Sequence, residues 1–205
     1  MKLLLCSWAP NKNEKLEETF LDLLSKPPKE NKSLILSIDT TSEYFVQQLD
    51  ILKTWYMQKG FQENNIKICN LKTDKIPSLD EIDILHMSGG NEFHYMYYIR
   101  EKGLLEEIHE FITRDRVYVG SSAGSVIMSS ELDENLSPDS NDVGLTDLSG
   151  FGYIDFNFLV HWDAMYSGLH ADWLRYTWKH GRRVVCLTDQ QAVLVLDDGF
   201  KIISP

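Results

Sequence analysis

The chain has 205 residues, of which 43% are hydrophobic and 25% are charged, and its formal net charge is −11. A chain of this length and composition buries a substantial core, so we expect one domain over residues 1–205 and exclude a disordered protein. The negative charge, with no clustered Lys/Arg stripe, repels phosphate backbones and argues against a nucleic-acid partner. No apolar stretch approaches the roughly 20 residues of a membrane span, so we expect a cytoplasmic protein without a membrane segment.

Short apolar runs alternate with amphipathic ones along the chain. The apolar runs predict strands at residues 2–7, 34–38, 66–69, 82–87, 116–119, 153–161 and 184–187. Helical spacing predicts helices at residues 14–24, before Gly60, at 95–99, at 104–112 and at 172–178. The last two runs, 192–196 and 200–203, predict a C-terminal β-hairpin. Alternating strands and helices indicate an α/β sandwich with a largely parallel sheet.

Two glycine-rich turns follow predicted strands directly. They are Gly89-Gly90 and the segment Gly120-Ser121-Ser122-Ala123-Gly124. Ligands of such sheets bind beyond the carboxyl ends of the strands, so the two turns are expected at one site. Residues 131–147, rich in Asp, Asn and Ser, are the longest predicted loop and are expected to help shape that site.

The turn at residues 120–124 has the pattern Gly-x-Ser-x-Gly between a strand and a helix. A nucleophilic serine needs such a sharp turn with small neighbours, and the next helix adds N–H groups beside a developing oxyanion. Ser122 occupies the apex and is therefore preferred over Ser121 and Ser125. The alternative is a Gly/Ser turn that only joins strand to helix or binds a phosphate.

A nucleophilic serine also needs a base and an acid that orients it. Of the six histidines, His161 follows a predicted strand and is expected on the same edge as Ser122, whereas His86 is expected in the core. The other histidines, His94, His109, His170 and His180, fall outside predicted strands. Position alone does not choose among the acids of the long loop, which are Asp133, Glu134, Asp139 and Asp142.

These residues together resemble a known family. Gly89-Gly90-Asn91-Glu92-Phe93, Gly120-Ser121-Ser122-Ala123-Gly124 and the segment ending in Leu159-Val160-His161-Trp162 are similar to motifs of the aspartyl dipeptidase (peptidase E) family of serine peptidases. That family shares its fold with class I glutamine amidotransferases, and cyanophycinases are its relatives. The resemblance implies a three-layer sandwich with a mostly parallel central sheet, in addition to the C-terminal hairpin.

The resemblance also assigns roles to individual residues. Ser122 matches the nucleophile, His161 the general base, and Gly90 with the backbone N–H of Ala123 the oxyanion hole. The family's spacing from the histidine points to Asp139 as the acid, with Asp142 as the second choice.

A further arginine of the family binds the carboxylate of an N-terminal aspartate in the substrate. Arg175 stands at the matching offset from His161, and its guanidinium suits a carboxylate because it donates two parallel hydrogen bonds. The alternative for Arg175 is a surface position on a helix.

The sequence thus predicts a serine dipeptidase that hydrolyses short peptides as a monomer or homodimer, and the resemblance implies peptides with an N-terminal aspartate. No metal or other cofactor is expected, and the separated cysteines Cys6, Cys69 and Cys186 suggest neither a disulfide framework nor a zinc site. Two alternatives remain open. One is an esterase, amidase or cyanophycinase-like hydrolase with the same triad, and the other is a non-catalytic module that binds a small ligand.

Overall fold

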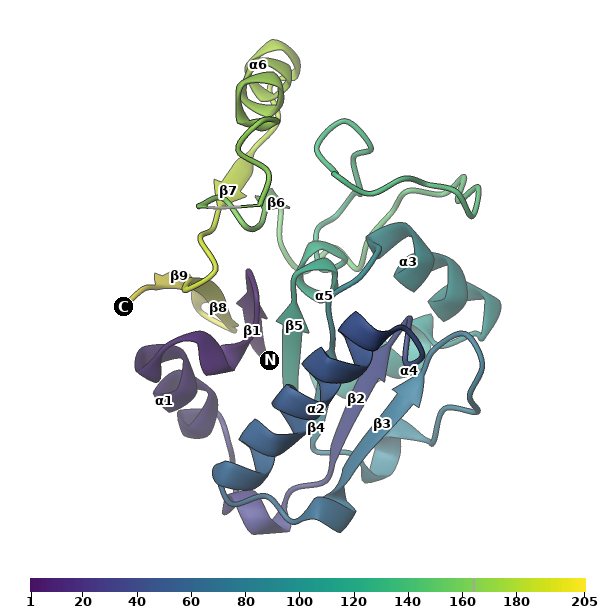
Figure 1. Cartoon of the computed structure of the whole chain (residues 1–205), viewed down its shortest axis with the longest axis vertical. Coiled ribbons are helices and arrows are strands. Elements are labelled where there is room, and N and C mark those ends of the chain that lie inside the picture. Colours follow the sequence, from purple (N-terminus) through teal and green to yellow (C-terminus); the bar gives the residue numbers. More distant parts are fainter. Residues whose placement is uncertain (164) are drawn as a thin grey trace.

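The computed structural model describes residues 1–163 and 165–205, and a seven-stranded sheet forms its centre (Figure 1). The strand order is β3-β2-β4-β5-β1-β8-β9. The first five strands in this order are parallel, and β8 and β9 close one edge as an antiparallel hairpin. The strands are β1 (Lys2–Cys6), β2 (Ser33–Ser37), β3 (Ile66–Asn70), β4 (Ile84–Met87), β5 (Val117–Ser121), β8 (Ala192–Leu196) and β9 (Gly199–Ile203).

Helices cover both faces of this sheet. One face carries α1 (Glu14–Asp22) and α2 (Glu43–Gln58), and the other carries α3 (Glu92–Glu101) and α4 (Leu105–Thr113). The short α5 (Ala123–Val126) follows β5 directly. Short 3₁₀ turns are η1 (Pro10–Lys12), η2 (Pro28–Glu30), η3 (Glu63–Asn65) and η4 (Leu79–Glu81). The predicted three-layer α/β sandwich with a mostly parallel sheet and a C-terminal hairpin is confirmed.

The central strands are apolar because both of their faces are covered. In β1, Leu3 and Leu5 pack in the cluster with α3 and α4, whereas Leu4 packs in the cluster with α1 and α2. All three leucines are fully buried. Each contributes about 1.5–3 kcal/mol of hydrophobic free energy, so the strand end that leads to the site is anchored in the core.

A second, smaller unit stands apart from the main sheet at the upper end of Figure 1. It consists of the parallel pair β6 (Asn157–Leu159) and β7 (Val184–Cys186), with α6 (His170–His180) above it. The predicted strands at 153–161 and 184–187 therefore pair with each other outside the central sheet. The first is also shorter than predicted, because Tyr153 N donates to Met128 O (3.0 Å) and is held by the segment after α5.

Within residues 1–163 and 165–205, the helices are all too short or too polar to cross a membrane.

Candidate active site

Ser122 lies at the tip of a strained turn between β5 and α5. Its φ and ψ are 51° and −115°, in a region that non-glycine residues rarely adopt and that costs on the order of 1–3 kcal/mol. The backbone holds it there: Ser122 N donates to Cys6 O (3.1 Å), and Ser122 O accepts from Ser125 N (2.7 Å). Ser122 thus occupies the apex of the turn and lines the cavity described below.

Close backbone approach explains the glycines around this turn. A Cβ at Gly124 would lie 2.3 Å from Met87 O, so α5 reaches β4 only because residue 124 has no side chain. Gly90 has φ 136°, and a Cβ there would lie 2.6 Å from Ile38 Cδ1. Gly90 and Ala123 both border the space in front of Ser122, where the sequence predicts an oxyanion hole.

Asn91, the third residue of the Gly-Gly-Asn motif, has a structural role. It is the N-cap of α3, since its Oδ1 accepts from Phe93 N (2.9 Å) and His94 N (3.1 Å). Its Nδ2 donates to Ser140 O (2.8 Å) and so ties the start of α3 to the long loop after α5.

His161 is brought to Ser122 from the smaller unit. It lies just beyond β6 with φ 57°, and its backbone N donates to Ser7 Oγ (2.8 Å), while Ser7 Oγ donates to Leu187 O (3.1 Å). The edge of Trp8 meets the imidazole at a centroid distance of 5.2 Å. His161 Nε2 is 3.0 Å from Ser122 Oγ. The residue after β1 thus fastens the end of β6 to the main sheet and fixes the position of the imidazole.

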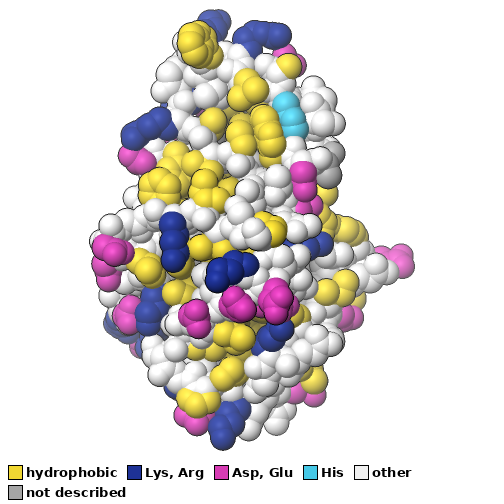
Figure 2. All heavy atoms as spheres, turned by 90° about the vertical axis from the view of Figure 1, so that its left-hand side faces the viewer, with side chains coloured by type: hydrophobic (Ala, Val, Ile, Leu, Met, Phe, Trp, Pro, Cys, Tyr) yellow, Lys and Arg dark blue, Asp and Glu magenta, His cyan; other side chains and the backbone are white. Residues whose placement is uncertain are grey.

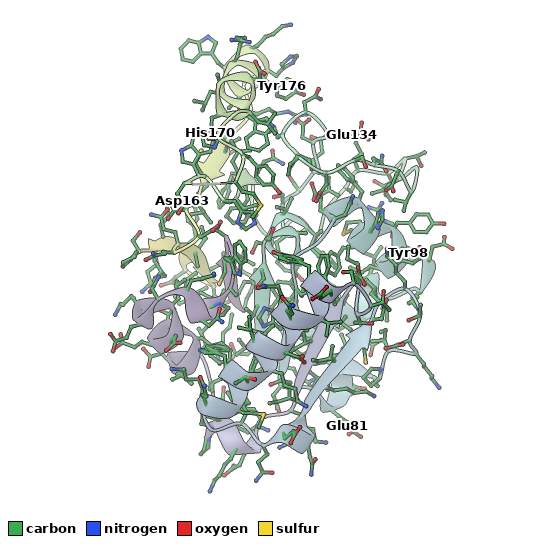
Figure 3. The ribbon with its side chains drawn as sticks, in the orientation of Figure 1. Glu81, Tyr98, Glu134, Asp163, His170 and Tyr176 are labelled. Carbon is green, nitrogen blue, oxygen red and sulfur yellow. The ribbon has the colours of Figure 1, made fainter. Side chains whose placement is uncertain are left out.

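Asp189 contacts the other nitrogen of the same imidazole. Asp189 Oδ1 lies 2.5 Å from His161 Nδ1, and the aspartate side chain is 21% exposed. Its backbone N donates to Asp163 Oδ1 (3.1 Å), and Figure 3 labels Asp163 beside the smaller unit. A carboxylate only accepts, so the proton of a neutral imidazole lies on Nδ1, and Nε2 accepts from the Ser122 hydroxyl.

The prediction that Asp139 contacts His161 is wrong in this structure. Asp139 lies in the long loop, where its N donates to Ser137 Oγ (2.9 Å) and its carboxyl faces Glu92. The second choice, Asp142, is exposed and pairs with His94 (2.5 Å). Spacing from the histidine pointed to the wrong segment, because β6 pairs with β7 and the chain after β7 brings Asp189 to His161.

Glu92 and Asp139 form a pair of carboxyl groups on the wall of the site. Glu92 is only 4% exposed, and Ser137 Oγ donates to its Oε1. Burial raises the pKa of Glu92 to about 8, and the charge of Asp139 adds to the effect. Burial also raises the pKa of Asp139, although the nearby His94 and His161 oppose this shift. One proton is therefore held between the two carboxyls at neutral pH.

A cavity of about 800 Å³ joins these groups. Ser122, His161, Glu92 and Asp139 all line it, as do aromatic side chains from four parts of the chain. The aromatic residues are Trp8, Tyr44, Phe45, Phe158, Tyr166 and Trp173. The long loop leans on α6 through a hydrogen bond between Asn135 and the Tyr176 hydroxyl (3.2 Å), and Glu134 and Tyr176 lie near each other in Figure 3.

Arg175 does not border this cavity. Its side chain is 76% exposed and its guanidinium donates to Asp172 Oδ1 (2.8 Å) on the same helix. Trp173, two residues earlier, is 4% exposed and packs with Leu136 and Leu159. Two residues turn a helix by about 200°, so α6 buries Trp173 and directs Arg175 to solvent. The surface alternative for Arg175 describes this structure.

A series of buried hydrogen bonds lies beside the turn at residues 120–124. Tyr56 Oη is 3.1 Å from His86 Nδ1, and His86 Nε2 is 2.8 Å from Ser121 Oγ. His86 is fully buried, which lowers its pKa to about 3, so the imidazole stays neutral. The predicted core position of His86 is confirmed, and these hydrogen bonds brace the residue next to Ser122.

Across the part of the chain that the structure describes, no three His, Cys, Asp or Glu residues are grouped as a metal ion requires.

Comparisons with known proteins agree with this architecture. The sequence profile of peptidase family S51 matches residues 3–203. An uncharacterized peptidase of Listeria monocytogenes is 31% identical over 83 residues, which are 40% of this chain and 40% of that protein. Peptidase E of Salmonella gallinarum is 29% identical over 82 residues, 40% of this chain and 33% of that enzyme. The alignments with these two relatives thus span well under half of the relatives' length.

Solved structures resemble the whole chain. The crystal structure of a peptidase E-type protein from Listeria monocytogenes superposes with a TM-score of 0.80 at 18% identity. The superposition covers 100% of this chain and 98% of that one. A peptidase from an acI-B1 Actinobacterium gives a TM-score of 0.72 at 13% identity, covering 100% and 87%. At these identities the two likenesses establish the fold.

Proposed function

Because the chain belongs to peptidase family S51, we propose that it is a serine peptidase that hydrolyses short peptides through Ser122, His161 and Asp189. The observation that carries this proposal is the continuous path from Ser122 Oγ to His161 Nε2 (3.0 Å) and from His161 Nδ1 to Asp189 Oδ1 (2.5 Å). The order and roles of the three groups follow the logic of serine hydrolases on other folds.

Acylation begins when a peptide carbonyl carbon reaches Ser122 Oγ. His161 Nε2 takes the hydroxyl proton as the oxygen attacks, and Asp189 stabilises the imidazolium that forms. Backbone N–H groups of Gly90 and Ala123 stabilise the oxyanion, assisted by the first turn of α5. His161 then gives its proton to the leaving amine, which departs and leaves an ester on Ser122.

Deacylation reverses the proton transfers. His161 takes a proton from water, the hydroxide oxygen attacks the ester carbonyl, and the proton returns to Ser122 Oγ as the carboxylate product forms. The strained φ of Ser122 suits both halves, since it keeps Oγ at the tip of the turn where attack is unhindered.

The substrate is proposed to be a short peptide. The cavity has a volume of about 800 Å³ and is walled by the long loop and the smaller unit, which fits a few residues rather than a folded protein. A preference for N-terminal aspartate has no support from Arg175, whose side chain points to solvent away from the cavity.

The first test is labelling by a fluorophosphonate, which reacts with activated serines. Purified protein should gain one label, located at Ser122 by peptide mass spectrometry, and the Ser122→Ala variant should gain none. Dipeptides and simple esters offered in parallel would separate a peptidase from an esterase. The proposal fails if the parent protein stays unlabelled, or if Ser122→Ala cleaves peptides at the parent rate.

A further inference from the structure

Glu92 is a buried acid without a basic partner. It is 4% exposed and lines the catalytic cavity, yet among the described residues no Lys, Arg or His forms an ion pair with it. Its neighbours are the Ser137 hydroxyl and another acid, Asp139. Burying a carboxyl group costs free energy unless a cation or hydrogen-bond donors compensate, so this arrangement is incomplete for an ionised Glu92.

Position links this acid to the reaction. Glu92 follows Gly90 and the N-cap Asn91, so it is fixed to the strand end that borders Ser122. Glu92 and Asp139 line the same cavity as Ser122 and His161. A group bound between Glu92 and Asp139 therefore lies beside the nucleophile rather than in a remote pocket.

The cavity walls favour a cation as the missing partner. Tyr166 lines the cavity together with Glu92 and Asp139, and burial raises the pKa of its hydroxyl. Tyr44 and Trp8 line the same space. Aromatic faces beside carboxylates are the surroundings in which proteins bind ammonium and guanidinium groups.

The two lysines of the cavity lining do not compensate Glu92. Lys12 lies over the Trp8 ring (4.2 Å from Nζ to the ring centre) and Lys72 lies toward the Tyr98 ring (5.7 Å). Arg175, the residue expected to bind a substrate carboxylate, points to solvent. The cavity therefore has two acidic side chains near Ser122, whereas its two lysines contact aromatic rings.

We propose that Glu92, backed by Asp139, is the specificity-determining residue of this site and binds a cationic nitrogen of the substrate. The inference rests on the proposed function, since it names the substrate class of the same cavity. When the cation enters, the proton held between the two carboxyls leaves to solvent, and the ammonium donates to the carboxylates in its place. The nitrogen is either the N-terminal ammonium of a peptide or a basic side chain.

Binding to the Ser122→Ala variant of the full chain tests this without turnover. Four probes separate the two sources of the nitrogen: lysinamide carries both cations, norleucinamide only the α-ammonium, N-acetyl-lysinamide only the side-chain ammonium, and N-acetyl-norleucinamide none. Calorimetry should find the preferred cationic probe bound at least about tenfold more tightly than the neutral one. Adding Glu92→Gln or Asp139→Asn should abolish that preference.

Asp142→Asn is the matched control, because this loop acid is 63% exposed and contacts His94 instead of Glu92. It should leave the preference within about twofold of the background variant. Three results would overturn the inference. The four probes bind equally, or aspartamide, added as an acidic probe, binds more tightly than the cationic probes. The third is an unchanged preference in both Glu92→Gln and Asp139→Asn. Failure of the proposed function would give a different result, because Ser122 of the parent protein would then carry no fluorophosphonate label.

Discussion

The two regions that meet at the site are built differently. Ser122 stands on the seven-stranded sheet, between strands that are buried on both faces, whereas His161 and Asp189 stand beside a pair of three-residue strands. Figure 2 shows apolar side chains exposed in the upper part of the molecule, toward α6, with Lys and Arg side chains at the top, and acidic, basic and apolar side chains mixed over the lower part. Ser122 is thus part of the core, and His161 and Asp189 are held by a small unit fastened to it. Changes in the packing of the first region should affect folding, and changes at His161 and Asp189 in the second should affect turnover.

The largest effect is expected for His161→Ala. Loss of the base should lower kcat by roughly 10⁴-fold or more, because Ser122 then has no group that takes its proton. The melting temperature should change little, since the histidine lies at the junction with the smaller unit. Steady-state kinetics and calorimetry on the same preparation measure both quantities. A variant that loses less than tenfold in kcat would show that another group acts as the base.

In contrast to His161→Ala, which mainly lowers kcat, Gly124→Ala should mainly lower the stability of the fold. Its Cβ would lie 2.3 Å from Met87 O, so the turn or β4 must move, at a cost of about 3 kcal/mol. The melting temperature should fall by roughly 6–12 °C. Gly168→Ala is the control, because no atom lies within 4 Å of the added Cβ. Equal melting temperatures for the two variants would contradict the close approach of α5 to β4.

Ser7→Ala tests the fastening between the two regions. The Ser7 hydroxyl accepts from His161 N (2.8 Å) and donates to Leu187 O (3.1 Å), so its loss should let the imidazole drift from Ser122. We expect kcat to fall by about tenfold with a smaller change in KM. Ser130→Ala, at an exposed serine, should change neither constant. A Ser7→Ala enzyme with unchanged kcat would mean that packing alone positions His161.

The smallest effect concerns the Glu92–Asp139 pair and the pH dependence of stability. Between the ordinary Glu pKa of 4.5 and the raised value near 8, folded protein keeps a proton on Glu92 that the unfolded chain releases. Stability therefore falls as pH rises through this range. Glu92→Gln removes this loss. Relative to the parent, its melting temperature should therefore rise between pH 5 and pH 8. Parallel melting curves for the two proteins over that range would contradict the raised pKa.

Local patterns predicted what local structure determines. The strands of the central sheet, the glycine turn and the apex serine all follow from residues close together in the chain, and the structure has them where expected, whereas the strand predicted at 153–161 is confined to 157–159. His161 was found because it follows an apolar run. The two failures, Asp139 and Arg175, depend on long-range packing.

The position of Asp189 depends on the pairing of β6 with β7, which local sequence patterns do not predict. β6 and β7 run parallel with Leu159 opposite Cys186, so the residues that follow the two strands leave the sheet side by side. The run at 184–187 was recognised as a strand, but its pairing with 157–159 was not. Had that pairing been assigned, Asp189 would have been the first carboxylate beyond the second strand. Arg175 failed for a similar reason, because the burial of Trp173 sets the rotation of α6.

The most direct test of the triad compares Asp189→Asn with Asp139→Asn in the rate of fluorophosphonate labelling at Ser122. Both variants keep the shape of the side chain and remove the negative charge, and the reaction reports activation of the serine independently of substrate recognition. The account predicts that Asp189→Asn slows labelling by about 100-fold or more, because His161 loses the group that fixes its tautomer, and that Asp139→Asn stays within about threefold of the parent. The reverse order, slow labelling in Asp139→Asn and parent-like labelling in Asp189→Asn, would contradict it.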